Sequence, residues 1–333
     1  MQLAARTRHV LLPLAAGMLC CAQAGASMQE RVLQVPVSTT SPQGKQVKGQ
    51  IAVTVYSDPA NPVPAPVLVL NHGRSPQAEG RKELHRARFA KQARFFVSRG
   101  FLVAVPTRLG YGPTFEDDAE DSGPCKSKRF APAMNSAATQ ITTVLEAVRH
   151  LRSDASPDRA VIVGQSFGGA ASVAAGAKNP AGVQAVINFA GGAGGNPRTH
   201  TAKPCEPEQM AQAYRDWGSK TQLPMLWIYA GNDQYFGAEW PVKWHAAFEQ
   251  GGGRAQFKQF PSFGKDGHEL FRAGSRQWEP LVSQFLDEAG FPLPNVTNAT
   301  NAPAAPAAPA VPASAPASAA ATSTATSTEE AAR

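Results

Sequence analysis

The sequence predicts an α/β protein with a mostly parallel, eight-stranded sheet and helices on both faces. Short apolar runs alternate with amphipathic stretches along the middle of the chain, at the spacing of strand–helix units. Several of these runs are continuously apolar, which is typical of strands that are buried on both faces. With 333 residues, 43% of them hydrophobic and 17% charged, the chain is long enough to bury such a sheet in one domain.

Eight segments have the composition of strands, and the first two predict an antiparallel pair. The predicted strands cover residues 32–37, 50–56, 66–70, 101–105, 160–163, 183–187, 224–229 and 255–260. Apolar stripes at helical spacing lie between them, and a helix of small residues is expected over residues 167–178. The stripes include Phe89, Ala93, Phe96 and Val97; Ile141, Val144, Leu145 and Val148; and Trp278, Leu281, Val282 and Phe285. In such sheets the reacting groups lie at the carboxyl ends of the strands.

The N-terminus has the pattern of a targeting signal. Two arginines precede an apolar run over residues 10–19, and small residues that fit a cleavage site follow. This pattern predicts a signal peptide over residues 1–26 and a periplasmic or secreted protein. Cys20 and Cys21 raise a lipoprotein as the alternative, but the residues before them match a lipobox poorly.

The C-terminus differs from the rest of the chain as well. Residues 292–333 consist largely of Ala, Pro, Ser and Thr, so they have little to bury and predict a disordered tail. The folded domain is therefore expected over residues 27–291. No later stretch is long and apolar enough to predict an integral membrane segment once the signal is removed.

The net charge bears on the kind of partner, and the cysteines bear on disulfide and metal binding. The net charge of +7 is a mild excess, and no nucleic-acid motif accompanies it, so no nucleic-acid partner is expected. Outside the signal only Cys125 and Cys205 remain, and in an oxidising compartment such a pair predicts a disulfide bond. Their spacing does not resemble a zinc site, so neither a metal nor a cofactor is expected.

A candidate nucleophile follows the predicted strand over residues 160–163. Residues 164–168 read Gly-Gln-Ser-Phe-Gly and precede a helix of small residues, the context in which G-x-S-x-G is informative. The sharp turn is expected to strain the backbone of Ser166 and to point its hydroxyl out of the sheet. The flanking glycines are expected because side chains there would clash with the neighbouring strand and helix.

A serine nucleophile needs a histidine to accept its proton and an acid to orient that histidine. Asp233 follows the predicted strand over residues 224–229, and His268 follows the last predicted strand, so both are expected at the same sheet edge as Ser166. Asp266 is the alternative acid. The other histidines fit less well because they lie in helical patterns or in a long loop: His85, His150, His200 and His245.

Two backbone amides are expected to stabilise an oxyanion. One belongs to Phe167, directly after the nucleophile, and the other to Arg74, in the loop after the third predicted strand. His72, in the same loop, is expected to shape the loop or contact substrate rather than to act as a second base.

These motifs together resemble those of the α/β-hydrolase superfamily, and within it the dienelactone-hydrolase-like branch. The resemblance covers roughly residues 30 to 290 and implies an α/β-hydrolase fold and a Ser-His-Asp triad. The sequence departs from true dienelactone hydrolases in carrying Ser166 where they use cysteine, so a generic ester is a better expected substrate than a dienelactone.

The substrate pocket is expected between two long loops, residues 107–133 and 191–223. Each loop contains one cysteine of the predicted disulfide, which would tie the loops together and contribute about 2–4 kcal/mol to stability. Four aromatic residues are candidates to line an apolar site, with ordinary packing as the alternative: Tyr111, Tyr235, Phe236 and Trp240.

The sequence therefore predicts an exported serine hydrolase that cleaves small-molecule or polymeric carboxylic esters through an acyl-enzyme. A peptidase or an acyltransferase would use the same triad. A non-catalytic binding protein on a hydrolase scaffold is the alternative from another class, but such a protein has no need of three chemically matched residues in this order.

Overall fold

The computed structural model describes residues 28–294. The predicted signal peptide and the part of the predicted tail from residue 295 onward lie outside these residues. In the described part of the chain, no helix is both long and apolar enough to span a membrane.

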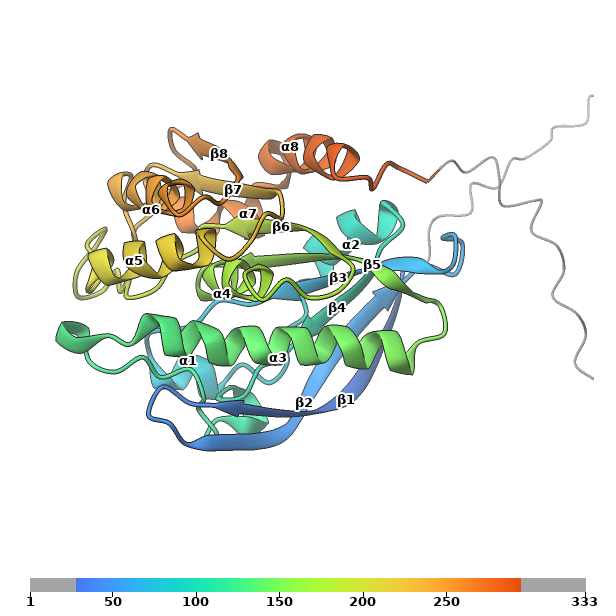
Figure 1. Ribbon diagram of the computed structural model, residues 1–333, viewed down its shortest axis with the longest axis horizontal. Helices are drawn as coiled ribbons and strands as arrows, with labels where there is room; N and C mark the ends of the chain where they lie inside the picture. The colour runs from blue at the N-terminus through green and yellow to red at the C-terminus, as the bar shows by residue number, and fades with distance from the viewer. Residues whose placement is uncertain (1–27, 295–333) are drawn as a thin grey trace, which may run out of the picture. The chain divides into compact units, whose positions relative to one another are not determined.

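An eight-stranded sheet runs through the described domain in the order β1-β2-β4-β3-β5-β6-β7-β8 (Figure 1). The strands are β1 (Gln29–Thr40), β2 (Gln46–Ser57), β3 (Ala65–Asn71), β4 (Leu102–Pro106), β5 (Ala155–Gln165), β6 (Val183–Phe189), β7 (Met225–Ala230) and β8 (Ala255–Phe260). β2 is antiparallel to both β1 and β4, and the remaining pairs are parallel. The predicted fold class and the opening antiparallel pair are confirmed.

Helices cover both faces of the sheet. They are α1 (Ala78–Lys82), α2 (Ala90–Ser98), α3 (Phe130–Leu151), α4 (Phe167–Gly176), α5 (Pro207–Gly218), α6 (Glu239–Gln250), α7 (Leu270–Ala273) and α8 (Ser275–Glu288). Three short 3₁₀ turns complete the elements: η1 (Gly112–Thr114), η2 (Cys125–Ser127) and η3 (Gly267–Glu269). α3, α4, α5 and α6 pack on one face, and α2, α7 and α8 pack on the other.

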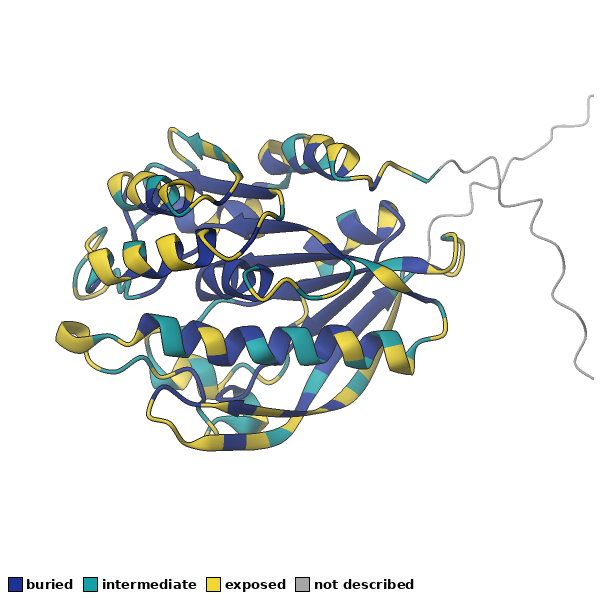
Figure 2. Cartoon of the chain, in the orientation of Figure 1, coloured by how far each residue is buried: buried dark blue, intermediate teal, exposed yellow. Residues whose placement is uncertain are grey.

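The core has two layers because the central strands are buried on both sides (Figure 2). In β3, Val67 and Val69 face the α3 and α4 layer, whereas Leu68 and Leu70 face the α2 and α8 layer. All four side chains are fully buried. This double burial is the physical reason for the continuous apolar runs in the sequence.

The helix α4 packs closely against the sheet because it is built from small residues. All ten of its residues are buried, and most of them are Gly or Ala. Small side chains let the helix axis approach β5 and β6, so that the N-terminus of α4 lies at the carboxyl edge of the sheet. The loops after β5, β7 and β8 meet at this edge.

Candidate active site

Ser166 occupies a sharp turn between the end of β5 and the start of α4. Its φ of 58° and ψ of −127° are strained for a residue with a side chain. The Ser166 amide donates to the Phe189 carbonyl at 2.9 Å, which ties the turn to the neighbouring strand β6. A Cβ atom on Gly168 would collide with the His72 carbonyl, so a glycine is needed for this close approach. The turn therefore has the form that G-x-S-x-G predicts.

Asp233 and His268 form a buried hydrogen-bonded pair after β7 and β8. His268 Nδ1 donates to Asp233 Oδ2 at 2.8 Å, and the two side chains are 6% and 0% exposed. The other carboxylate oxygen of Asp233 accepts the amides of Tyr235 and Phe236, at 2.7 and 3.0 Å. Asp266 instead accepts the His268 amide at 2.9 Å and caps the η3 turn. Asp233, and not Asp266, is therefore the carboxylate that contacts the imidazole.

The charges around His268 favour its protonated form. Burial lowers the pKa of the imidazole, but the negative charge of Asp233 raises it, and Asp266 and Glu269 add to that effect. The pKa of His268 consequently lies above its ordinary value. A histidine tuned in this way is suited to accept a proton and to hold it while a reaction intermediate forms.

Two cavities meet at Ser166, one of about 350 Å³ and one of about 680 Å³. Ser166, Arg74, Ser75 and Tyr235 line both of them, and His268 lines the larger one. Within residues 28–294 no hydrogen bond joins the Ser166 hydroxyl to the imidazole. In ligand-free enzymes such bonds are often long and tighten only when substrate binds.

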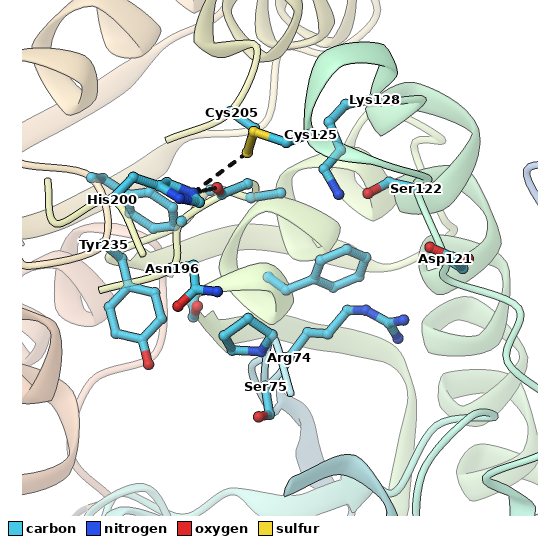
Figure 3. A pocket seen from close by; sticks show the side chains of 18 of the residues that line it. Arg74, Ser75, Asp121, Ser122, Cys125, Lys128, Asn196, His200, Cys205 and Tyr235 are labelled. Atoms are coloured by element: carbon cyan, nitrogen blue, oxygen red, sulfur yellow. Dashed lines mark hydrogen bonds between the residues drawn. A yellow bond between two sulfur atoms is a disulfide. The ribbon is translucent and has the colours of Figure 1, made fainter. Parts of the chain in front are cut away.

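The smaller cavity has a disulfide in its wall (Figure 3). Cys125 in η2 is bonded to Cys205, just before α5, with 5.1 Å between their Cα atoms. The predicted disulfide is therefore confirmed, and it links the two long loops that were expected to form the pocket. His200 Nε2 lies 3.5 Å from the sulfur of Cys205. These three residues lie close enough together to bind a metal, but sulfurs bonded to each other offer no thiolate to one.

The loop after β3 lies directly against Ser166. A Cβ atom on Gly73 would lie 2.9 Å from the Ser166 Cβ and 3.4 Å from its hydroxyl oxygen. The amides of Arg74 and Phe167 have no hydrogen-bond partner among the residues that the structure describes. The Arg74 side chain instead makes a bidentate ion pair with Asp118. Nη1 donates to Oδ1 at 3.1 Å, and Nη2 donates to Oδ2 at 2.6 Å. Both predicted oxyanion donors therefore lie beside Ser166 with unused N–H groups.

The sequence that folds into this site can be compared with those of known protein families. The model of the dienelactone hydrolase family matches residues 53–287. The chain belongs to the dienelactone hydrolase family. No curated protein matches its sequence.

Solved structures that resemble this dienelactone hydrolase family member include peptidases and esterases. An acylaminoacyl peptidase from Pyrococcus horikoshii is 15% identical, with a TM-score of 0.54 over 77% of this chain and 41% of that one. An acylaminoacyl peptidase bound to Z-Gly-Gly-Phe-chloromethyl ketone is 14% identical, with a TM-score of 0.52 over 81% and 44%. An esterase from Pyrococcus furiosus is 9% identical, with a TM-score of 0.49 over 78% and 91%. This chain thus spans less than half of the two peptidases, and the likeness concerns the fold.

The aromatic residues suggested as pocket lining fall into two groups in this family member. Tyr235 stacks on the His268 ring with centroids 4.0 Å apart, and Phe236 lies edge-on to it at 5.4 Å. Both line the smaller cavity. Tyr111 is fully buried and donates to Glu120, and Trp240 packs near Trp244; neither lines either cavity.

Two residues that the sequence argument overlooked contribute to the site. Gln165, directly before Ser166, donates its side-chain amide to the His268 carbonyl at 3.1 Å and so joins the two loops. Its position inside the G-x-S-x-G motif was a signal for such a role. Lys128 points into the smaller cavity and is half-buried, and burial lowers its pKa. Nothing in the local sequence distinguishes it from an ordinary surface lysine.

Proposed function

We propose that this family member is an exported serine hydrolase that cleaves carboxylic esters through an acyl-enzyme. Ser166 is the nucleophile, His268 the general base, and Asp233 the acid that orients the imidazole. The proposal is carried by one observation: a serine in strained backbone geometry lies at the same cavity as a histidine whose Nδ1 is held by a buried carboxylate. That combination activates a hydroxyl that is otherwise nearly inert.

The chemistry of the first half-reaction follows from these positions. Ser166 Oγ attacks the ester carbonyl carbon while its proton passes to His268 Nε2. The carbonyl oxygen becomes an oxyanion, and the amides of Phe167 and Arg74 donate to it. Collapse of this intermediate breaks the bond to the alcohol oxygen, which takes the proton from Nε2. The alcohol leaves, and the acyl group stays on Ser166.

The second half-reaction repeats these steps with water. His268 takes a proton from the water molecule, whose oxygen attacks the acyl carbon. The bond between that carbon and Ser166 Oγ then breaks, Oγ takes the proton from His268, and the carboxylic acid leaves. Asp233 stabilises the imidazolium in both halves. Its oxygens accept from two backbone amides and the imidazole, which holds the carboxylate in place.

The two cavities offer room for both parts of an ester. Because they meet at Ser166, the acyl group can occupy one and the alcohol part the other. Their volumes of about 350 and 680 Å³ lie in the range of small-molecule binding pockets. The tyrosine and phenylalanine beside the imidazole supply the apolar contacts.

Export is supported by two independent observations. The N-terminal sequence has the pattern of a secretory signal, and the Cys125–Cys205 disulfide is of the kind that persists in oxidising compartments. We therefore propose that the protein acts in the periplasm or outside the cell.

A peptidase is the second candidate, and it is favoured by the likeness to acylaminoacyl peptidases. The same triad cleaves amides. This chain spans only 41% of the Pyrococcus horikoshii enzyme, so it does not carry all of that protein. An ester and an amide with the same acyl group separate the two candidates. Both enzymes would cleave the ester, but only a peptidase would also cleave the amide at an appreciable rate.

Labelling with a fluorophosphonate tests the mechanism itself. The reagent should modify the wild-type protein at Ser166, as mapped by peptide mass spectrometry, and should not modify Ser166→Ala. Ser172→Ala is a matched control, because Ser172 is a fully buried serine of α4 that lines neither cavity. A folded wild-type protein that resists the reagent would favour a non-catalytic binding protein.

A further inference from the structure

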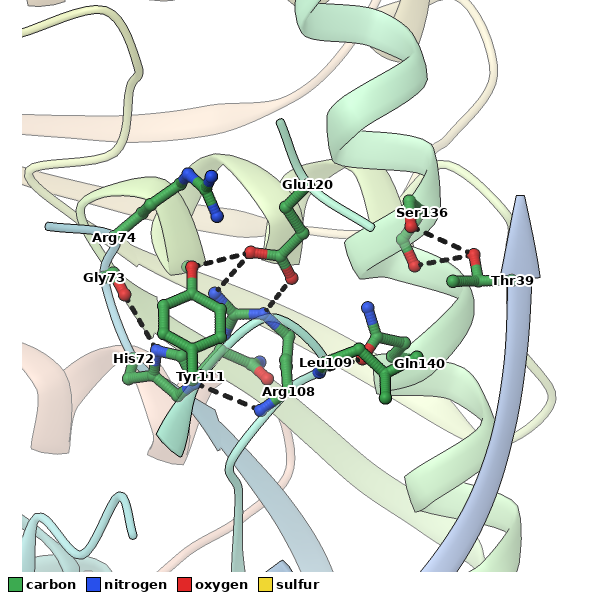
Figure 4. A network of polar contacts seen from close by, with 12 residues as sticks. Thr39, His72, Gly73, Arg74, Arg108, Leu109, Tyr111, Glu120, Ser136 and Gln140 are labelled. Atoms are coloured by element: carbon green, nitrogen blue, oxygen red, sulfur yellow. Dashed lines mark hydrogen bonds and ion pairs between the residues drawn. The ribbon is translucent and has the colours of Figure 1, made fainter. Parts of the chain in front are cut away.

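A buried histidine supports the loop that carries one of the proposed oxyanion donors. His72 directly follows β3 and is 4% exposed. Both of its ring nitrogens contact the main chain (Figure 4): Nδ1 lies 2.7 Å from the Gly73 carbonyl oxygen, and Nε2 lies 3.2 Å from the Arg108 amide nitrogen. The ring is therefore engaged by the protein at both nitrogens.

These two contacts determine the tautomer. A backbone N–H can only donate, so Nε2 of His72 must accept from Arg108 and carry no proton. The proton of a neutral ring is then on Nδ1, where it donates to the Gly73 carbonyl. Burial and the positive charges of Arg108 and Arg74 hold the pKa of His72 well below its ordinary value, so the ring stays neutral.

The carbonyl that His72 holds belongs to the same peptide unit as the Arg74 amide. This unit is planar and trans, so its C=O and N–H point to opposite sides. A donor that fixes the carbonyl on one side consequently fixes the direction of the N–H on the other. The unit lies beside the nucleophile, since a Cβ atom on Gly73 would lie 2.9 Å from that of Ser166.

We propose that His72 is a positioning residue of the oxyanion hole, which holds the Gly73 carbonyl through Nδ1–H and thereby aims the Arg74 amide at the substrate oxygen. The inference rests on the proposed function, because it needs Arg74 to be an oxyanion donor. It assigns His72 no proton transfer, since the Nε2 lone pair already accepts from Arg108.

The amide that holds His72 is itself fixed by a buried ion pair. The Arg108 guanidinium and the Glu120 carboxylate are both fully buried and are 2.6 Å apart. Tyr111 donates to the same carboxylate at 2.7 Å and lies edge-on to the His72 ring, with centroids 4.4 Å apart. The direction of the Arg74 amide is thus set by a chain of contacts that starts in the loop after β4.

Two variants of His72 form a matched pair for the test. Asn and Leu share the same branching at Cγ, but only Asn carries an N–H at the place of Nδ1. His72→Leu should lower kcat for an ester by about 10- to 100-fold, less than the loss of a whole oxyanion donor, and leave KM within about twofold. His72→Asn should keep kcat within about threefold of wild type.

Two further readouts separate positioning from general structural damage. The affinity of His72→Leu for a trifluoromethyl ketone that mimics the oxyanion should fall by the same factor as kcat/KM. The acid limb of the pH profile of kcat/KM should stay in place in both variants, because His268 remains the base. A limb that moves or disappears would overturn the inference, as would equal losses of kcat in the Asn and Leu variants.

The wild-type protein gives an independent measurement if His72→Leu does not fold. Two-dimensional proton–nitrogen correlation of the imidazole should show His72 as the neutral Nδ1–H tautomer at pH 7 and above. A protonated ring or the opposite tautomer would overturn the inference. An unreactive wild-type enzyme would instead contradict the proposed function, whereas an active enzyme indifferent to His72→Leu would contradict only the role of His72.

Discussion

The Cys125–Cys205 disulfide should contribute measurably to the stability of the domain. Its cysteines are separated by 80 residues in the sequence. In the chain-entropy description, such a cross-link removes about 15 cal/mol/K from the unfolded chain, or about 4.5 kcal/mol at 25 °C. For a domain of roughly 270 residues this corresponds to a fall of about 8 °C in Tm when the bond is removed. The contribution falls to the expected range of about 2–4 kcal/mol if the unfolded chain keeps some structure.

Denaturant unfolding of a double variant measures this contribution. Cys125→Ser suits the exposed partner, and Cys205→Ala suits the buried one because it leaves no polar group inside. The double variant should lose stability and show a larger denaturant dependence, since its unfolded chain is less constrained. Wild-type protein treated with a dithiol should match it, and the dithiol should leave the variant unchanged. A loss below about 1 kcal/mol would refute the reasoning.

Three further changes test the site and its support. Asp233→Asn should lower kcat by about 10³- to 10⁴-fold. It should also move the acid limb of the kcat/KM profile to lower pH, because the charge that raises the pKa of His268 is gone. An acid limb that stays in place would contradict this. Glu120→Ala should lower the free energy of unfolding in urea by about 3–5 kcal/mol, because it leaves Arg108 buried without its partner. A loss under about 1 kcal/mol would argue against the ion pair. Gly73→Ala should reduce kcat at least about tenfold with little change in Tm, because its Cβ displaces the nucleophile; full activity in an ester assay would count against this geometry.

Much of the fold could be predicted because burial on both faces leaves a clear mark on the sequence. The run over residues 255–260 matches β8 at both ends. The run over residues 160–163 marks only the middle of β5, which begins at Ala155. The residues before Ala160 include Pro157 and Asp158, which favour turns, and the pairing with β3 is irregular there. Tertiary pairing extends the strand where local preference would end it.

The positions of the candidate triad could be predicted because parallel strands deliver their ends to one edge. Ser166, Asp233 and His268 each follow a recognisable strand. The supporting contacts could not be predicted, since they join residues that are distant in the sequence. Gln165 contacts a carbonyl 103 residues away, and His72 accepts an amide 36 residues away. Local composition contains no signal for contacts of this kind.

The positions of the aromatic side chains could not be predicted from the sequence either. Tyr111 and Tyr235 both lie in loops after strands, and the sequence marks both as candidates for the pocket. Tyr235 does line the two cavities, whereas the hydroxyl of Tyr111 is satisfied by Glu120 inside the protein. Which partner an aromatic ring meets depends on how the loops pack, and that packing is set by the disulfide and the buried ion pair.

The most direct test of the central claim is the hydrolysis of p-nitrophenyl esters, from acetate to laurate, by wild-type protein and by Ser166→Ala. We expect wild-type turnover with a preference for one range of chain lengths, and a loss of about 10⁴-fold or more in the variant. Equal turnover by the two proteins would contradict a serine nucleophile at this position. No turnover of any ester by folded wild-type protein would contradict the esterase assignment.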